Sequence, residues 1–211
     1  PGTWQGGPIW NSSTYCSTPH VDLGYFQTPG VYKYTSDIQI SGGGAATLKS
    51  CSGTFGTRAM TQMIHGSYII YVQGNITIAD DLNLDRGNGD TSNNVGTTKF
   101  AKLTDIPQFT IYATGNIKIN SNVSRIDANL ISGGTITTCD SGYSSGAADL
   151  GENATCGNNL MINGAMVSSG SPKFQRTFGA ELSGTGAPIQ TPAETVNYTP
   201  SLFLAPFVNS G

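Results

Sequence analysis

The sequence has few charged residues and no concentrated basic segment. Only 11% of its 211 residues are charged, against about 25% in an average globular protein. No run of lysine or arginine is longer than one residue, and the formal net charge is −3. Nucleic-acid binding depends on a basic footprint that neutralises phosphates, so this composition argues against a nucleic-acid partner.

Long apolar runs and recognisable catalytic motifs are also missing. No stretch approaches the roughly 18 apolar residues of a membrane-spanning helix, so we expect no membrane span in this fragment. The H-E-x-x-H pattern and the phosphate loop are absent, and no enzymatic activity is expected. The chain starts at Pro1, without an initiator methionine or signal peptide. We therefore expect a mature or trimmed ectodomain.

The chain has only four cysteines and two histidines, and their spacing does not suit a metal site. Zinc sites favour C-x2-C pairs with histidine nearby, and neither feature occurs. An even number of cysteines in an exported protein favours disulfides. Because two pairs are close in sequence, we predict the disulfides Cys16–Cys51 and Cys139–Cys156.

The residues that are abundant indicate short strands separated by tight corners. Glycine alone accounts for 28 residues, and glycine and asparagine tolerate corner conformations at low cost. The stretch from Phe109 to Thr138 contains strand-like runs at Thr110–Ala113, Ile117–Ile119, Ile126–Ile131 and Thr135–Thr138. Apolar and polar residues alternate along these runs, which predicts strands with one face in the core.

A degenerate repeat relates this stretch to earlier segments. An x-Ile-x-Ile pattern follows equivalent corner residues at Asp37, Asn75 and Asn116. Stacking these segments would place Ile76 over Ile117, Ile78 over Ile119, and Tyr71 beside Tyr112. We predict an all-β fold: a single-stranded, right-handed parallel β-solenoid with irregular caps and insertion loops. A two-sheet antiparallel sandwich is the alternative.

The prediction divides the chain into three parts. Residues 1–30 are expected to form an irregular, aromatic cap over an open strand edge. Residues 31–178 form the body, and residues 179–211 form an extended, proline-rich tail. Four apolar residues of this tail are expected to support assembly: Leu202, Phe203, Leu204 and Phe207.

Several blocks resemble a known class of bacterial proteins. They include Ile111–Ile117, Arg125–Cys139, Leu160–Ala165, Arg176–Gly179 and Pro192–Pro200. Together they cover about residues 68–206 and are similar to exported β-helical surface or pilus-associated proteins. The resemblance implies an extracellular or cell-surface location. It assigns no catalytic residue, because such proteins mostly lack an assigned activity.

The acidic stretch from Asp80 to Asp90 is the candidate metal site. Alternate oxygen ligands resemble the start of a calcium loop, at Asp81, Asn83 and Asp85, with Asp90 as a further candidate. The pattern then fails, because Arg86 stands where such a loop has glycine. A solvated turn is the alternative to a calcium site, and no other cofactor is predicted.

A polysaccharide-binding or polysaccharide-cleaving domain is the competing functional hypothesis. The aromatic residues that could contact sugar are Trp4, Trp10, Tyr71 and Tyr112. Cleavage needs an acid with a partner, and Asp127 beside Arg125 is the best candidate. Both residues would point outward if Ile126 points inward, and a structural ion pair is the simpler interpretation. We expect Arg176 to bond backbone carbonyls.

The sequence thus favours a non-enzymatic extracellular surface protein, structural or adhesive. A pilus or filament subunit is the most specific form of this hypothesis, with assembly through the ends of the body and the tail. The expected partners are other copies of the chain or other surface or pilus proteins, with glycans as an additional class.

Overall fold

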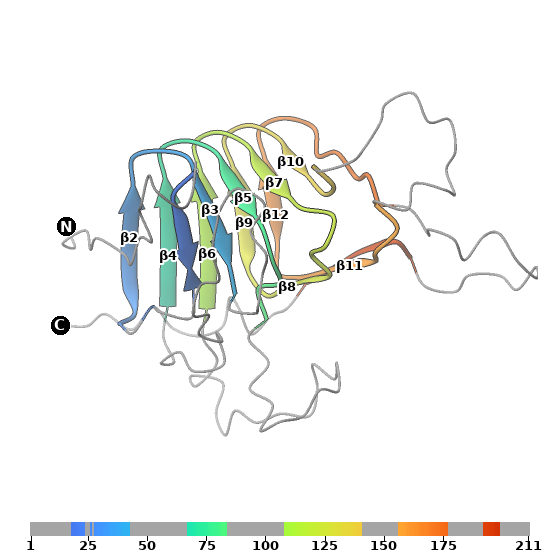
Figure 1. Ribbon diagram of the computed structural model, residues 1–211, viewed down its shortest axis with the longest axis horizontal. Coiled ribbons are helices and arrows are strands. Elements are labelled where there is room, and N and C mark those ends of the chain that lie inside the picture. Colours follow the sequence, from blue (N-terminus) through green and yellow to red (C-terminus); the bar gives the residue numbers. More distant parts are fainter. Residues whose placement is uncertain are drawn as a thin grey trace, which may run out of the picture.

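The structure, a computed structural model, describes residues 18–23, 26, 28–42, 67–83, 108–140, 156–176 and 192–198. Within these ranges the chain forms β-strands and no α-helix. Every strand pairing is parallel (Figure 1). The antiparallel sandwich is therefore excluded for this part of the chain.

The strands belong to three sheets. Sheet 1 comprises β2 (Gly30–Tyr34), β4 (Ser67–Val72), β6 (Gln108–Ala113), β9 (Asn129–Ser132) and β12 (Met166–Ser168). Sheet 2 comprises β1 (His20–Asp22), β3 (Ile38–Ser41), β5 (Ile76–Ile78), β7 (Ile117–Ile119) and β10 (Ile136–Thr137). Sheet 3 comprises β8 (Arg125–Ile126), β11 (Leu160–Asn163) and β13 (Glu194–Asn197).

The predicted single-stranded solenoid is wrong. The described strands form three separate parallel sheets of five, three and five strands, and they do not form a single solenoid. The physical reason is visible in the run Ile126–Ile131, which was expected to be one strand. The chain turns at Asp127 and Ala128, so Ile126 pairs in sheet 3 while Leu130 pairs in sheet 1.

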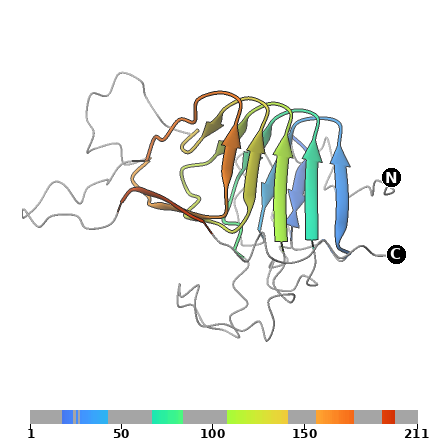
Figure 2. The same cartoon turned by 180° about the vertical axis from the view of Figure 1, so that it is seen from behind.

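The predicted register of the repeats is confirmed. In sheet 2, Ile76 pairs with Ile117 and Ile78 pairs with Ile119. In sheet 1, Tyr71 pairs with Tyr112. Figure 2 shows the strands of sheet 1 side by side and pointing the same way, with β2 at one edge and β12 at the other. Equivalent side chains therefore form rows that cross each sheet.

One apolar core lies between the sheets. Alternate residues of β4 and β6 are fully buried, as period-two alternation predicts. Stacked isoleucines from sheet 2 meet stacked aromatic residues from sheet 1, where the Tyr68 and Phe109 rings lie parallel with centroids 5.0 Å apart. Ile126 and Ile162 of sheet 3 belong to the same core, as does Leu82, which forms an isolated parallel bridge with Ile126. Each buried aliphatic side chain contributes about 1.5–3 kcal/mol to stability.

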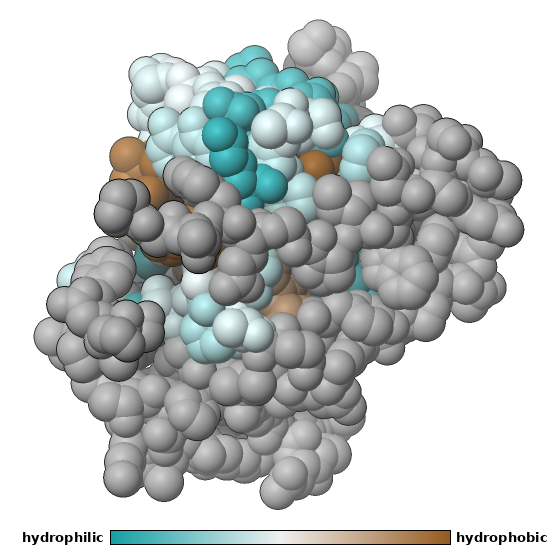
Figure 3. All heavy atoms as spheres, turned by 90° about the vertical axis from the view of Figure 1, so that its left-hand side faces the viewer, coloured by the Kyte–Doolittle hydropathy of each residue, from teal (hydrophilic) through white to brown (hydrophobic). Residues whose placement is uncertain are grey.

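Two of the strands lie in the segments assigned to the cap and the tail. Strand β1, within residues 1–30, pairs with β3. Strand β13, within residues 179–211, pairs with β11. Figure 3 looks onto the β2 end of the molecule, where the described surface is mostly polar with a small hydrophobic group at its margin.

Candidate functional site

A ladder of polar side chains fills the corner between sheets 1 and 2. The Asn75 backbone N–H donates to Asp37 Oδ1 at 2.8 Å, and Asn75 Nδ2 donates to Asp37 Oδ2 at 3.0 Å. The Asn116 N–H donates to Asn75 Oδ1, and the Thr135 N–H donates to Asn116 Oδ1, both at 2.8 Å. These hydrogen bonds from Asn75 lower the pKa of Asp37. The corner asparagines therefore act structurally, by bonding the backbone of the next layer.

Glycine is required beside this ladder. A Cβ at Gly74 would lie 2.4 Å from Asp37 Oδ1, and one at Gly115 would lie 2.5 Å from Asn75 Oδ1. Gly74 also has a positive φ of 155°, which L side chains rarely adopt. The pairs Gly74-Asn75 and Gly115-Asn116 thus each act as one unit: the glycine leaves room for the Asp37 carboxylate or the Asn75 amide of the preceding layer.

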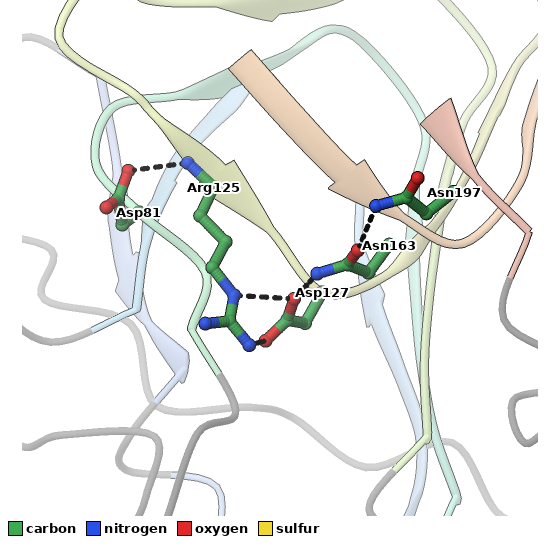
Figure 4. A network of polar contacts seen from close by, with 5 residues as sticks. All are labelled: Asp81, Arg125, Asp127, Asn163 and Asn197. Atoms are coloured by element: carbon green, nitrogen blue, oxygen red, sulfur yellow. Dashed lines mark hydrogen bonds and ion pairs between the residues drawn. The ribbon is translucent and has the colours of Figure 1, made fainter. Parts of the chain in front are cut away.

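Arg125 and Asp127 form a buried ion pair (Figure 4). Arg125 Nε lies 3.0 Å from Asp127 Oδ1, and Nη2 lies 2.9 Å from Oδ2. Their side chains are only 7% and 9% exposed. The expectation that both residues point outward is therefore wrong. The short strand β8 ends in a corner, so both neighbours of the buried Ile126 face the interior too.

The ion pair continues into a row of amides across sheet 3. Asn163 Nδ2 donates to Asp127 Oδ1 at 2.7 Å, and Asn197 Nδ2 donates to Asn163 Oδ1 at 3.1 Å (Figure 4). Both oxygens of Asp127 are thus engaged by protein donors. A carboxylate held in this way suits structural bonding between layers better than proton transfer to a substrate.

Asp81, the first calcium candidate, also bonds the backbone. Its carboxylate accepts hydrogen bonds from Ser124 N, Ser124 Oγ and Arg125 N at 2.6, 2.8 and 3.0 Å. Asn83 lies in the described part, whereas Asp85 and Asp90 lie outside it. No group of three or more metal-binding acidic, histidine or cysteine side chains occurs among the described residues. The calcium site remains a prediction.

Tyr71 and Tyr112, two of the carbohydrate candidates, lie together on the outer face of sheet 1. Their rings are stacked, with centroids 5.2 Å apart and planes within 7°. Lys33 Nζ lies 6.0 Å from the centroid of the Tyr71 ring. In register, Lys33 and Ile131 flank the two tyrosines. Trp4 and Trp10 lie outside the described residues.

Arg176 bonds backbone carbonyls, as predicted. Its guanidinium donates to the carbonyls of Thr138, Ser121 and Asn120 at 2.6, 2.6 and 2.7 Å. Its backbone N–H donates to Glu194 Oε1 at 2.5 Å, which also accepts from Thr138 Oγ1. Burial lowers the pKa of Arg176. Arg176 thus links the segments after β7 and β10 through its side chain and β13 through its backbone N–H.

The disulfide Cys139–Cys156 is confirmed. The two Cα atoms lie 5.9 Å apart, across 17 residues of sequence. Cys16 and Cys51 lie outside the described residues, so their pairing stays a prediction. A disulfide is compatible with an extracellular protein. Among the described residues, no helix is long and apolar enough to cross a membrane.

His20 is a buried histidine. Its Nε2 lies 2.9 Å from Ser41 Oγ, and burial lowers the pKa of His20 to about 4. It is therefore neutral at physiological pH. The sequence analysis did not single out this residue, because an isolated histidine gives no signal of burial.

A polar groove lies on the outer face of sheet 2, near its β10 edge. It has a volume of about 370 Å³. Lys118 Nζ forms an ion pair with Asp140 Oδ1 at 3.1 Å within it. The lining residues are Asn116, Lys118, Thr135, Thr137, Cys139, Asp140, Lys173 and Gln175. Sequence reasoning missed this groove, although the Ile117-Lys118-Ile119 alternation already places Lys118 on the outer face.

The exposed large hydrophobic side chains of the described residues lie near the last strands. They are Val167, Phe174, Val196 and Tyr198, with 56%, 60%, 44% and 67% exposure. Val167 is on β12, and Val196 is on β13. The four tail residues predicted to support assembly, Leu202, Phe203, Leu204 and Phe207, lie outside the described part.

Comparisons with protein-family models, with curated proteins and with solved structures find no match to this chain.

Proposed function

We propose that this chain is an extracellular structural or adhesive surface protein that associates with further copies of itself through the β12 and β13 end of its sheets. The observation that carries the proposal is that the exposed large hydrophobic residues of the described ranges all lie on or after β12, the last strand of sheet 1: Val167, Phe174, Val196 and Tyr198. Scattered single hydrophobic residues need no explanation, but a cluster at one end is typical of an interaction surface.

The positions of the edge strands also support self-association. Among the described strands, β12 is the last of sheet 1 and β13 is the last of sheet 3. A terminal strand presents unpaired backbone N–H and C=O groups, which can pair with a strand from another chain. Strand β2 forms the opposite edge of sheet 1. Contact between two different edges is head-to-tail, and such contacts extend into filaments when they do not close into a ring.

The polar networks are consistent with a structural role. The Asn75, Asn116 and Asp127 side chains are bonded to residues of neighbouring layers. These bonds join segments that are far apart in sequence and stiffen the stack of strands. Asp127, which sequence reasoning offered for cleavage, is part of these contacts, and this supports the structural role that we propose.

The substitution Val167→Lys tests self-association. A lysine at an exposed position of an edge strand opposes pairing with another chain. We expect the wild-type protein to show concentration-dependent association in analytical ultracentrifugation, and Val167→Lys to weaken it at least about tenfold. The matched control is Thr77→Lys, which adds the same charge on β5, an inner strand of sheet 2.

Both variants should keep the circular-dichroism spectrum of the wild type. Equal association of the two variants would remove the β12 edge from the proposal. A wild-type protein that stays monomeric up to millimolar concentration would contradict self-association as a whole.

A further inference from the structure

The outer face of sheet 2 brings together two lysines that are distant in sequence. Lys118 on β7 pairs in register with Thr137 on β10, and Thr137 forms a parallel bridge with Lys173. Neighbouring strands lie about 4.8 Å apart, so the two lysine backbones are about 10 Å apart with Thr137 between them. The buried Ile117, Ile119 and Ile136 fix this row on the outside of the sheet.

The groove around this row has a local charge opposite to that of the chain. Two lysines and one aspartate line it, whereas the whole chain has a formal net charge of −3. The Lys118–Asp140 pair has side chains 43% and 33% exposed, and exposed ion pairs contribute little to stability. Lys173 forms no ion pair with any residue in the described ranges. An incoming anion can therefore engage both ammonium groups at little cost.

The remaining lining groups are hydrogen-bonding and uncharged. The side chains of Asn116, Thr135 and Thr137 face the groove, as does Gln175. Gln175 Oε1 is buried and has no hydrogen-bond partner among the described residues. The uncharged groups that a ligand hydroxyl can reach from the groove are therefore the side chains of Asn116, Thr135 and Thr137, because the buried oxygen is closed to solvent.

We propose that this groove binds an acidic saccharide of the uronate type. Its carboxylate lies between the ammonium groups of Lys118 and Lys173, and its hydroxyls bond Thr135 and Thr137. The open, polar lining suits a hydroxylated ligand and offers no aromatic surface for a nucleobase or an apolar ligand. The groove adjoins the proposed contact surface at Phe174, which lies between Lys173 and Gln175 in the sequence, so the two proposals are tested with separate variants.

Isothermal titration calorimetry with tetragalacturonate tests the proposal. We expect saturable binding that weakens as salt is raised, because the contact is between charges. A neutral maltotetraose should bind at least about tenfold more weakly, which corresponds to the loss of one charge-assisted hydrogen bond. Lys173→Gln should weaken tetragalacturonate binding by a similar factor.

Matched variants separate the groove from the rest of the surface. Lys33→Gln removes the same charge from the outer face of sheet 1 and should leave binding unchanged. Thr137→Val should weaken the binding of both oligosaccharides, because it removes a hydroxyl contact.

The proposal is overturned if tetragalacturonate does not bind, if Lys33→Gln weakens its binding as much as Lys173→Gln, or if the neutral sugar binds equally well. Tighter binding of a sulfated tetrasaccharide would overturn the assignment of the carboxylate. The titration is repeated with the Val167→Lys variant, in which self-association is weakened. Unchanged binding by this variant shows that the groove binds the oligosaccharide without association of the chains.

Discussion

At the residue scale, several polar side chains in the described part of this protein bond residues of the next layer. Asn75 illustrates this: its side chain donates to Asp37 and accepts from the backbone of Asn116. One amide therefore satisfies polar groups in two other segments. Because strands this short offer few ladder hydrogen bonds, such corner contacts carry an unusual share of the cohesion between layers.

His20 makes a pH-dependent contribution to stability. Burial lowers its pKa to about 4, whereas an unfolded histidine has a pKa of about 6.5. Between these values the unfolded chain binds the proton and the native chain does not. Stability is therefore full above pH 6.5 and falls as the pH falls toward 4, by roughly 1 kcal/mol per pH unit from this residue.

Urea denaturation at pH 7, 6 and 5 measures this contribution. We expect His20→Gln to reduce the steepness of the acid loss, because its side chain takes up no proton. His65→Gln, which changes the other histidine of the chain, should keep the contribution of His20. A His20→Gln variant with the same pH profile as the wild type would show that His20 is not the group responsible.

At the scale of elements, sheet 3 depends on a buried charge pair. The row Asp127, Asn163 and Asn197 connects its strands through side chains. Arg125 supplies the balancing charge from β8. A buried charge is tolerated only when it is paired and hydrogen-bonded. The arrangement of the three strands of sheet 3 therefore depends on the Arg125–Asp127 ion pair.

We expect Asp127→Asn to lower the free energy of unfolding by about 3 kcal/mol, because it leaves a buried guanidinium without its carboxylate. Asp140→Asn is the matched control, since it breaks the exposed pair with Lys118 and should cost less than about 1 kcal/mol. Chemical denaturation of both variants measures the difference. Similar small losses would mean that the Arg125–Asp127 pair contributes no more than a surface contact.

At the scale of the molecule, the disulfide and Arg176 hold together segments that follow different sheets. Cys139 comes after β10, and Cys156 comes before β11. Arg176 bonds carbonyls after β7 and β10 and reaches β13 through Glu194. The exposed hydrophobic residues proposed for self-association lie in the same region of the chain. The disulfide and the hydrogen bonds of Arg176 therefore also hold the proposed contact surface in place.

Removing the disulfide should destabilise the protein. Closing a loop of about this length restricts the unfolded chain by roughly 3 kcal/mol. We therefore expect the double variant Cys139→Ser, Cys156→Ser to lose about that much in urea denaturation without reductant. Non-reducing peptide mapping should recover the Cys139–Cys156 peptide, and it tests the predicted Cys16–Cys51 pair in the same experiment. A loss below about 1 kcal/mol would indicate that the unfolded chain is compact without the bond.

The sequence alone determined the strands and their register where two local signals agreed. At Ile76 and Ile117, the alternation of apolar residues and the preceding Gly-Asn corner both specify the same alignment, and the structure has it. The neighbouring tyrosines, Tyr71 and Tyr112, follow from the same alignment. The Cys139–Cys156 disulfide was predictable because the two cysteines are close in sequence.

Only the tertiary structure decided how the strands divide into sheets. Ile126, Ala128 and Leu130 alternate like one strand, yet the chain turns between them, because Ile126 pairs with β11 and Leu130 pairs with β6 and β12. The same corner buries Arg125 and Asp127, which alternation alone places in water. Lys118 and Lys173 likewise meet only through the strand that carries Thr137. Local patterns fix which way a side chain faces along a regular strand, but pairing between distant segments fixes where each strand ends and what its side chains meet.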